Sequence, residues 1–125
     1  MKTLNQVREW HEHFQVPVLH EPALPEGRRE LRLSLLEEEI RELREAVEAG
    51  DMLEVLDALC DIQYVLDGTF LEFGLHPVKE AAFDEVQASN MSKLGEDGKP
   101  IFREDGKVLK GPNFRRPNLA QFIGA

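Results

Sequence analysis

The sequence is poor in cysteine and in long apolar runs. Its 125 residues include one cysteine, Cys60, which excludes an intrachain disulfide and any cysteine-based metal cluster built within one chain. No apolar run approaches the roughly 20 residues that a membrane-spanning helix needs. The first residues, MKTLNQVREW, lack the apolar segment of a secretion signal. We therefore expect a cytoplasmic protein without a membrane partner.

Charge is unevenly distributed along the chain, whose formal net charge is −9. Residues 1–92 carry 8 Lys or Arg against 20 Asp or Glu, a balance of −12. Residues 93–125 carry 7 against 4, a balance of +3. An acidic body argues against nucleic-acid binding, because the nucleic-acid backbone is itself negative. The basic C-terminal part is either solvated or meets an anion held against the acidic body.

Apolar periodicity predicts an all-α chain with four helices, over about residues 3–15, 28–49, 52–74 and 77–90. Thr3 and Gln6 have the spacing of a capping box at the first of these. After Gly95, two Asp-Gly pairs with flanking apolar pairs indicate a short β-hairpin or an ordered loop. We expect a four-helix bundle-like domain over 1–94, and an irregular basic extension, 95–125, that belongs to the same single domain.

The second predicted helix contains three consecutive glutamates. On a helical wheel of about 100° per residue, Glu39 and Glu42 fall at the edge of the apolar stripe that is expected to face the core. Glu38 lies at the margin and Glu37 on the solvated side. The apolar stripe itself consists of Leu36, Ile40, Leu43 and Val47.

The third predicted helix carries a narrow acidic stripe of Glu54, Asp57 and Asp61, with Glu72 further along it. Nearly all its other residues are apolar, and a charged carboxylate in apolar surroundings loses solvation. Several converging carboxylates repel one another unless a cation lies among them, and Mg²⁺ or Mn²⁺ suits such oxygen ligands. Alternatively, the third helix has a solvated edge, or these acids form ion pairs with nearby bases: Arg28, Arg29, Arg32 and Lys79.

Two stretches resemble the MazG-like all-α nucleoside triphosphate pyrophosphatases, a superfamily that includes phosphoribosyl-ATP pyrophosphohydrolase. These are EEEIRE, which contains E-E-x-x-E, and EVLDALCDIQYVLDGT on the next helix. The stretch SNMSKLGEDGKPIFREDGKVLKGPNFRRPNL is similar to the tail of the subgroup related to phosphoribosyl-ATP pyrophosphohydrolase. The resemblance implies Mg²⁺-dependent cleavage between the α- and β-phosphates, and assembly as dimers or pairs of dimers with sites near the subunit contacts.

The resemblance assigns metal binding to Glu39 and Glu42, with Glu38 completing the first motif. The second motif aligns in two ways: Glu54-x-x-Asp57 matches E-x-x-D literally, whereas an alternative alignment places Asp61 at the family's aspartate. All three therefore remain candidate ligands. Glu38 and Glu39 are the catalytic candidates, and Glu38 could position or deprotonate the attacking water.

A triphosphate also needs cationic and amide groups that hold its oxygens. The candidates follow the fourth predicted helix or lie in the basic extension: Asn90, Lys93, Lys107, Lys110 and Arg115.

The leading hypothesis is a Mg²⁺-dependent pyrophosphohydrolase that converts a (d)NTP to the monophosphate and pyrophosphate. The alternatives are a phosphoribosyl-ATP pyrophosphohydrolase of histidine biosynthesis and a non-catalytic, metal-binding helical module. Residues 52–74 are apolar around most of the helix, so a partner surface is expected to cover them. We expect a homodimer or a dimer of dimers.

Overall fold

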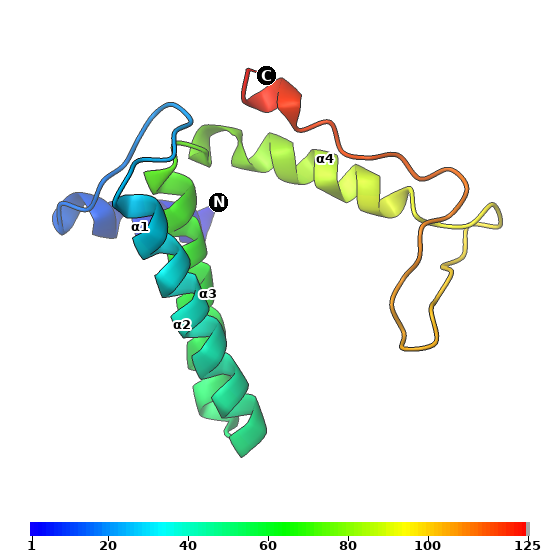
Figure 1. The fold of residues 1–125 in the computed structure, drawn as a ribbon, viewed down its shortest axis with the longest axis horizontal. Coiled ribbons are helices and arrows are strands. Elements are labelled where there is room, and N and C mark those ends of the chain that lie inside the picture. The colour runs from blue at the N-terminus through cyan, green and yellow to red at the C-terminus, as the bar shows by residue number, and fades with distance from the viewer. Residues whose placement is uncertain (125) are drawn as a thin grey trace. The chain divides into compact units, whose positions relative to one another are not determined.

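The computed structural model describes residues 1–124, which fold into helices and connecting loops (Figure 1). No strand forms within this range, and the predicted all-α, bundle-like fold class is confirmed. The α-helices are α1 (Lys2–His13), α2 (Arg28–Ala49), α3 (Met52–Glu72) and α4 (Lys79–Met91), with short 3₁₀ turns at His76–Val78 and Ala120–Phe122.

The boundaries of α2 and α3 follow from local sequence. Gly50 ends α2 in the left-handed conformation, with φ 67°, which glycine adopts without steric cost. Asp51 then caps α3, because its side chain accepts a hydrogen bond from the Glu54 amide at 3.2 Å. The capping box expected at Thr3 and Gln6 is wrong: α1 already begins at Lys2, so Thr3 lies inside the helix.

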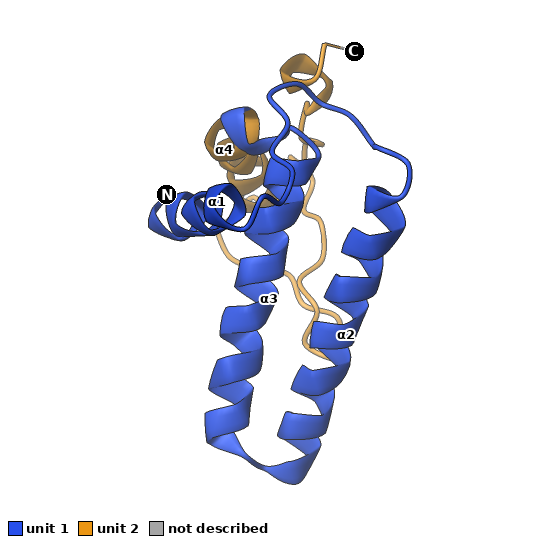
Figure 2. Ribbon diagram, turned by 90° about the vertical axis from the view of Figure 1, so that its left-hand side faces the viewer, with its two compact units in different colours: residues 1–77 blue, residues 78–125 orange. Residues whose placement is uncertain are grey.

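The chain divides into two compact units, the first of which is Met1–Pro77. Within it, α2 and α3 run side by side as an antiparallel hairpin, and α1 packs against α3 (Figure 2). Its small core consists of Leu4, Val7 and Leu71, with Val18 and Phe70 packed against it. The connector after α1 is fixed to the end of α3 by main-chain hydrogen bonds, including Leu19 N–H to Leu71 O at 2.9 Å.

The face of α2 that meets α3 differs from the expected one. Ala46 on α2 and Ala58 on α3 are buried, whereas Ile40 and Val47 are 55% and 59% exposed. Of the expected apolar stripe of α2, Leu36 and Leu43 are half-buried, while Ile40 and Val47 lie outside the buried face. The edge that carries Glu39 and Ala46 faces α3 instead, and the small alanines permit a close helix–helix approach.

The second unit begins at Val78 and comprises α4 and the C-terminal extension. The extension folds back along α4: the Ser89 hydroxyl donates to Arg115 O at 2.8 Å, and the Arg115 amide donates to Ser92 Oγ at 3.0 Å. Phe102 and Val108 form an isolated antiparallel bridge, so this part is an ordered, hairpin-like loop. The expected division at residues 94 and 95 stays a prediction.

None of the helices in residues 1–124 is long and apolar enough to cross a membrane.

Leu71→Ala tests the small core. Leu71 is fully buried, so truncation removes its apolar contacts and leaves a cavity. We expect the free energy of unfolding to fall by about 2–5 kcal/mol, measured by urea denaturation. Leu24→Ala is the matched control, because Leu24 is 62% exposed and should change stability little. Equal effects of the two substitutions would contradict the assigned core.

Candidate metal centre

Three carboxylates converge at the middle of the α2–α3 hairpin. Glu39 and Glu42 of α2 and Asp61 of α3 each offer an oxygen, and these oxygens all lie within 4.8 Å of one another. Glu39 and Glu42 share a helix face because they are three residues apart. Close packing at Ala46 and Ala58 brings this face against α3. We call these three residues the carboxylate cluster.

Glu39 is the most perturbed member of the carboxylate cluster. Loss of solvation, a hydrogen bond with Glu42, and the charges of Glu42, Asp61 and Glu38 raise the pKa of Glu39 from its ordinary 4.5 to about 7. A hydrogen bond between two carboxyl groups requires that one of them carry a proton. With its pKa raised to about 7, Glu39 holds a proton over a wider pH range in the metal-free folded chain than an ordinary glutamate does.

Asp61 experiences the same environment from the side of α3. Loss of solvation raises the pKa of Asp61, and the charges of Asp57 and Glu42 raise it further. Within residues 1–124, no lysine or arginine forms an ion pair with the carboxylate cluster. The alternative that nearby arginines neutralise these three acids is thus not supported.

The donor set fits a hard divalent cation. Glu39 Oε2 is buried and has no hydrogen-bond partner in the structure, which is costly for a polar oxygen unless a cation or donor completes it. Three carboxylates in reach of one another match the oxygen-rich coordination of Mg²⁺ and Mn²⁺. The carboxylate cluster could therefore hold a divalent metal ion.

The other two predicted ligands lie beside the carboxylate cluster, towards the Gly50 turn. Glu54 and Asp57 line an open hollow of about 370 Å³. Alanines, among them Ala46 and Ala58, form part of its lining, and the remaining acids are Glu42, Glu45 and Asp51. Because Glu42 belongs to both groups, the hollow adjoins the carboxylate cluster. Of the three candidates on α3, Asp61 is the one that contributes to the cluster.

Glu38 is exposed on α2, next to the carboxylate cluster. Its charge acts on Glu39, so it lies within electrostatic reach of the predicted metal ligands. Its carboxylate is accessible to water at this place.

The predicted substrate-binding residues all belong to the second unit. Asn90 and Lys93 lie at the end of α4, and the Lys107 amide donates to Asp105 at 3.1 Å. Lys110 Nζ lies 4.9 Å from the ring centroid of Phe114. Arg115 is paired with Glu85 at 3.0 Å. Their approach to the carboxylate cluster stays a prediction.

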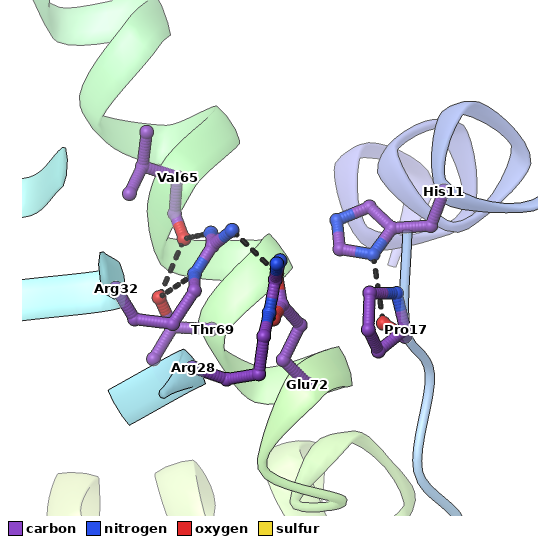
Figure 3. A network of polar contacts seen from close by, with 7 residues as sticks. All are labelled: His11, Pro17, Arg28, Arg32, Val65, Thr69 and Glu72. Carbon is purple, nitrogen blue, oxygen red and sulfur yellow. Dashed lines mark hydrogen bonds and ion pairs between the residues drawn. The ribbon is translucent and has the colours of Figure 1, made fainter. Parts of the chain in front are cut away.

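Glu72 does not join the carboxylate cluster, although it shares the acidic stripe on the helical wheel. It is 1% exposed and accepts hydrogen bonds from Arg28 Nε at 2.7 Å and Arg32 Nη1 at 2.6 Å (Figure 3). The alternative prediction, that the acids form ion pairs with nearby arginines, is therefore confirmed for Glu72. Arg28 and Arg32 are four residues apart and so share one face of α2. This pair of bases is the feature of the sequence that could have separated Glu72 from the other acids.

Comparison with known families places the helical region of the chain in a family. Residues 7–90 match the model of the phosphoribosyl-ATP pyrophosphohydrolase family. The chain belongs to this family. The family is part of the MazG-like all-α pyrophosphatase superfamily, and the matched region includes α2, α3 and every residue of the carboxylate cluster.

One curated relative is an uncharacterized protein, L479, of Acanthamoeba polyphaga mimivirus. It is 31% identical over 83 residues, which are 64% of this chain and 33% of the relative. The match thus spans about a third of the relative's length.

The raised pKa of Glu39 predicts a pH-dependent stability in EDTA. Between pH 4.5 and about 7 the folded chain keeps a proton that the unfolded chain loses, so stability falls as pH rises through this window. We expect Glu39→Gln to raise the melting temperature at pH 8 and to flatten its decline between pH 5 and 8, measured by circular dichroism. Glu37→Gln, on the exposed side of α2, should retain the decline. Parallel curves for all three proteins would contradict the assigned pKa.

Proposed function

We propose that the protein is a Mg²⁺-dependent nucleoside triphosphate pyrophosphohydrolase, which cleaves between the α- and β-phosphates to give a monophosphate and pyrophosphate. The observation that carries this proposal is the carboxylate cluster, with its unpartnered Glu39 oxygen, inside the region that matches the family. Mn²⁺ is the expected substitute for Mg²⁺, since both prefer oxygen ligands.

Charge explains why this site needs a cation. A triphosphate carries roughly four negative charges, and the carboxylate cluster adds its own. Bound Mg²⁺ would neutralise both sets and orient the phosphates for attack. Glu39, Glu42 and Asp61 would hold the ion, with Glu54 and Asp57 as further candidate ligands. Glu38 would position or deprotonate the attacking water, because it lies next to Glu39 in sequence and is not a member of the carboxylate cluster.

The basic part of the chain supplies the phosphate-binding groups. Lys93 and Lys107 form no ion pair within residues 1–124, so their charges are available to an anion. Lys110, Arg115 and the Asn90 amide are further candidates. The net positive charge of residues 93–125, +3, would then serve to bind the phosphates of the substrate.

Phosphoribosyl-ATP is the second candidate substrate, because the matching family model is that of phosphoribosyl-ATP pyrophosphohydrolase. Both reactions break the same type of phosphoric anhydride bond, so the carboxylate cluster serves either one. Substrate identity depends on the groups that contact the base and sugar.

A substrate panel tests the function. We expect Mg²⁺- or Mn²⁺-dependent release of pyrophosphate from at least one member of a set of NTPs, dNTPs and phosphoribosyl-ATP, abolished by excess EDTA. Release from phosphoribosyl-ATP alone would select the second candidate. Metal binding without any turnover would favour a non-catalytic helical module.

Substitution of the carboxylates tests the site. Glu39→Gln and Asp61→Asn should each lower turnover by at least about 100-fold without unfolding the chain, because each removes like-charge repulsion. Glu37→Gln is the matched control and should retain activity. Full activity in both cluster variants would contradict the site.

A homodimer, or a dimer of dimers, is the proposed assembly. Ile40, Val47, Leu56 and Leu59 on the α2–α3 hairpin are 50–60% exposed, and apolar area in water costs about 25 cal/mol per Å². A second copy that covers these side chains would remove this cost. It would also bring the basic extension of one chain towards the carboxylate cluster of the other.

Light scattering coupled to gel filtration tests the assembly. The chain mass is 14.3 kDa, and we expect a mass of at least twice this value at micromolar concentration. Ile40→Glu should shift the protein towards the monomer, whereas Leu24→Glu, in the connector, should not. A fully active monomer would contradict the proposal.

A further inference from the structure

A buried polar network joins α2 to α3 at the end of the hairpin away from the Gly50 turn (Figure 3). It consists of Arg28 and Arg32 of α2 with Glu72, the Thr69 hydroxyl and the Val65 carbonyl of α3. We call it the arginine clamp. The family match does not assign a role to it, and it is separate from the carboxylate cluster.

Arg32 is the centre of the arginine clamp. Its side chain is 7% exposed and contacts three groups on α3. Nη1 donates to Glu72 at 2.6 Å, Nη2 to Val65 O at 2.8 Å, and Nε to the Thr69 hydroxyl at 3.2 Å. Arg28 adds two bonds to Glu72, at 2.7 and 3.0 Å. The Glu72 carboxylate, fully buried, is thereby neutralised by two arginines.

The guanidinium of Arg32 lies directly against the α3 backbone. A Cβ atom at Gly68 would come within 2.5 Å of Arg32 Nη2 and 3.0 Å of His11 Nε2. A side chain at position 68 would therefore force the Arg32 guanidinium to shift away from the α3 backbone. His11 of α1, whose ring Nδ1 bonds with Pro17 O at 3.0 Å, borders the same space. The arginine clamp thus occupies a fitted site among three helices.

The carboxylate cluster lies between the arginine clamp and the Gly50 turn. Glu39 follows Arg32 by seven residues, and Thr69 follows Asp61 by eight, so both helices place the two groups about two turns apart. On the turn side, the buried contacts of the hairpin are those of Ala46 and Ala58. On the side away from the turn, α2 and α3 are joined by the hydrogen bonds of the arginine clamp.

This order matters because the carboxylates repel one another. Like charges at close range push the two helices apart or along each other. On the turn side, the apolar contacts that resist this are two buried alanines and the half-buried Leu43 and Val55. Hydrogen bonds to a particular carbonyl, hydroxyl and carboxylate break if α2 slides along α3 by one turn. Apolar contacts would tolerate the same displacement far better.

We propose that the arginine clamp is a positioning device for the cation site: it fixes the register of α2 on α3, so that Glu39 and Glu42 stay opposite Asp61. Arg32, Glu72 and Gly68 are its main positioning residues. This inference rests on the proposed function, because it assumes that the carboxylate cluster binds a divalent cation.

The test separates register from stability. Glu72→Met or Arg32→Met alone leaves a buried charge unpaired and should lower the melting temperature strongly. Arg32→Met/Glu72→Met removes both charges, and Arg28, whose side chain is 34% exposed, can turn to solvent. We expect the melting temperature of this double variant in EDTA to return to within about 5 °C of the unaltered protein.

Cation affinity should not return with stability. We expect the double variant to bind Mn²⁺ at least about tenfold more weakly by isothermal titration calorimetry. Its turnover should need correspondingly more Mg²⁺ but approach the unaltered rate at saturating Mg²⁺. Gly68→Ala, which displaces the Arg32 guanidinium, should weaken Mn²⁺ binding in the same direction.

Arg29→Met is the matched control, because Arg29 lies on α2 between the two clamp arginines and forms only an exposed pair with Glu26 at 3.7 Å. It should leave Mn²⁺ affinity unchanged. Normal affinity in the restored double variant would overturn the positioning role while the proposed function stands. Failure of the unaltered protein to bind Mn²⁺ would overturn both.

Discussion

Mutual repulsion among Glu39, Glu42 and Asp61 is the constraint on which the rest of the hairpin depends. One oxygen of each lies within 4.8 Å of the others, and the raised pKa of Glu39 reflects the cost of gathering these charges. The two helices nevertheless stay together, because contacts on either side of the cluster hold them. The Gly50–Asp51 turn and two alanines act on one side, and the arginine clamp on the other. Binding of a cation to these repelling carboxylates would therefore stabilise the folded chain.

The same arrangement accounts for the unusual use of polar and apolar surface. Between α2 and α3 the chain places carboxylates and arginines, whereas Ile40, Val47 and Leu59 remain exposed. The proposed register of the two helices rests on these polar contacts, and the exposed apolar side chains are the basis of the proposed self-association. In the second unit, the extension is held to α4 by Ser89, Ser92 and Glu85, so its basic residues are presented on an ordered loop.

Family membership and geometry support the function from independent directions. The match over residues 7–90 assigns a family of pyrophosphohydrolases, while the raised pKa values and the unpartnered oxygen of Glu39 identify the place where a cation fits. Neither the family match nor the carboxylate cluster determines substrate preference, because the groups that contact the base and sugar are not part of the acidic motif. The phosphate-binding candidates all belong to the second unit.

Much of the fold was determined by the sequence alone. Apolar periodicity, Gly50 and Asp51 located α2 and α3, and the spacing of Glu39 and Glu42 placed them on one face, because these features depend on helix geometry within a few residues. Only the tertiary structure decided which helix faces meet. It left Ile40 and Val47 exposed, selected Asp61 as the third member of the cluster and paired Glu72 with Arg28 and Arg32. Asp61 and Glu72 are equivalent on a helical wheel, and they differ only in what the neighbouring helix presents at each level, which is a contact between residues distant in sequence.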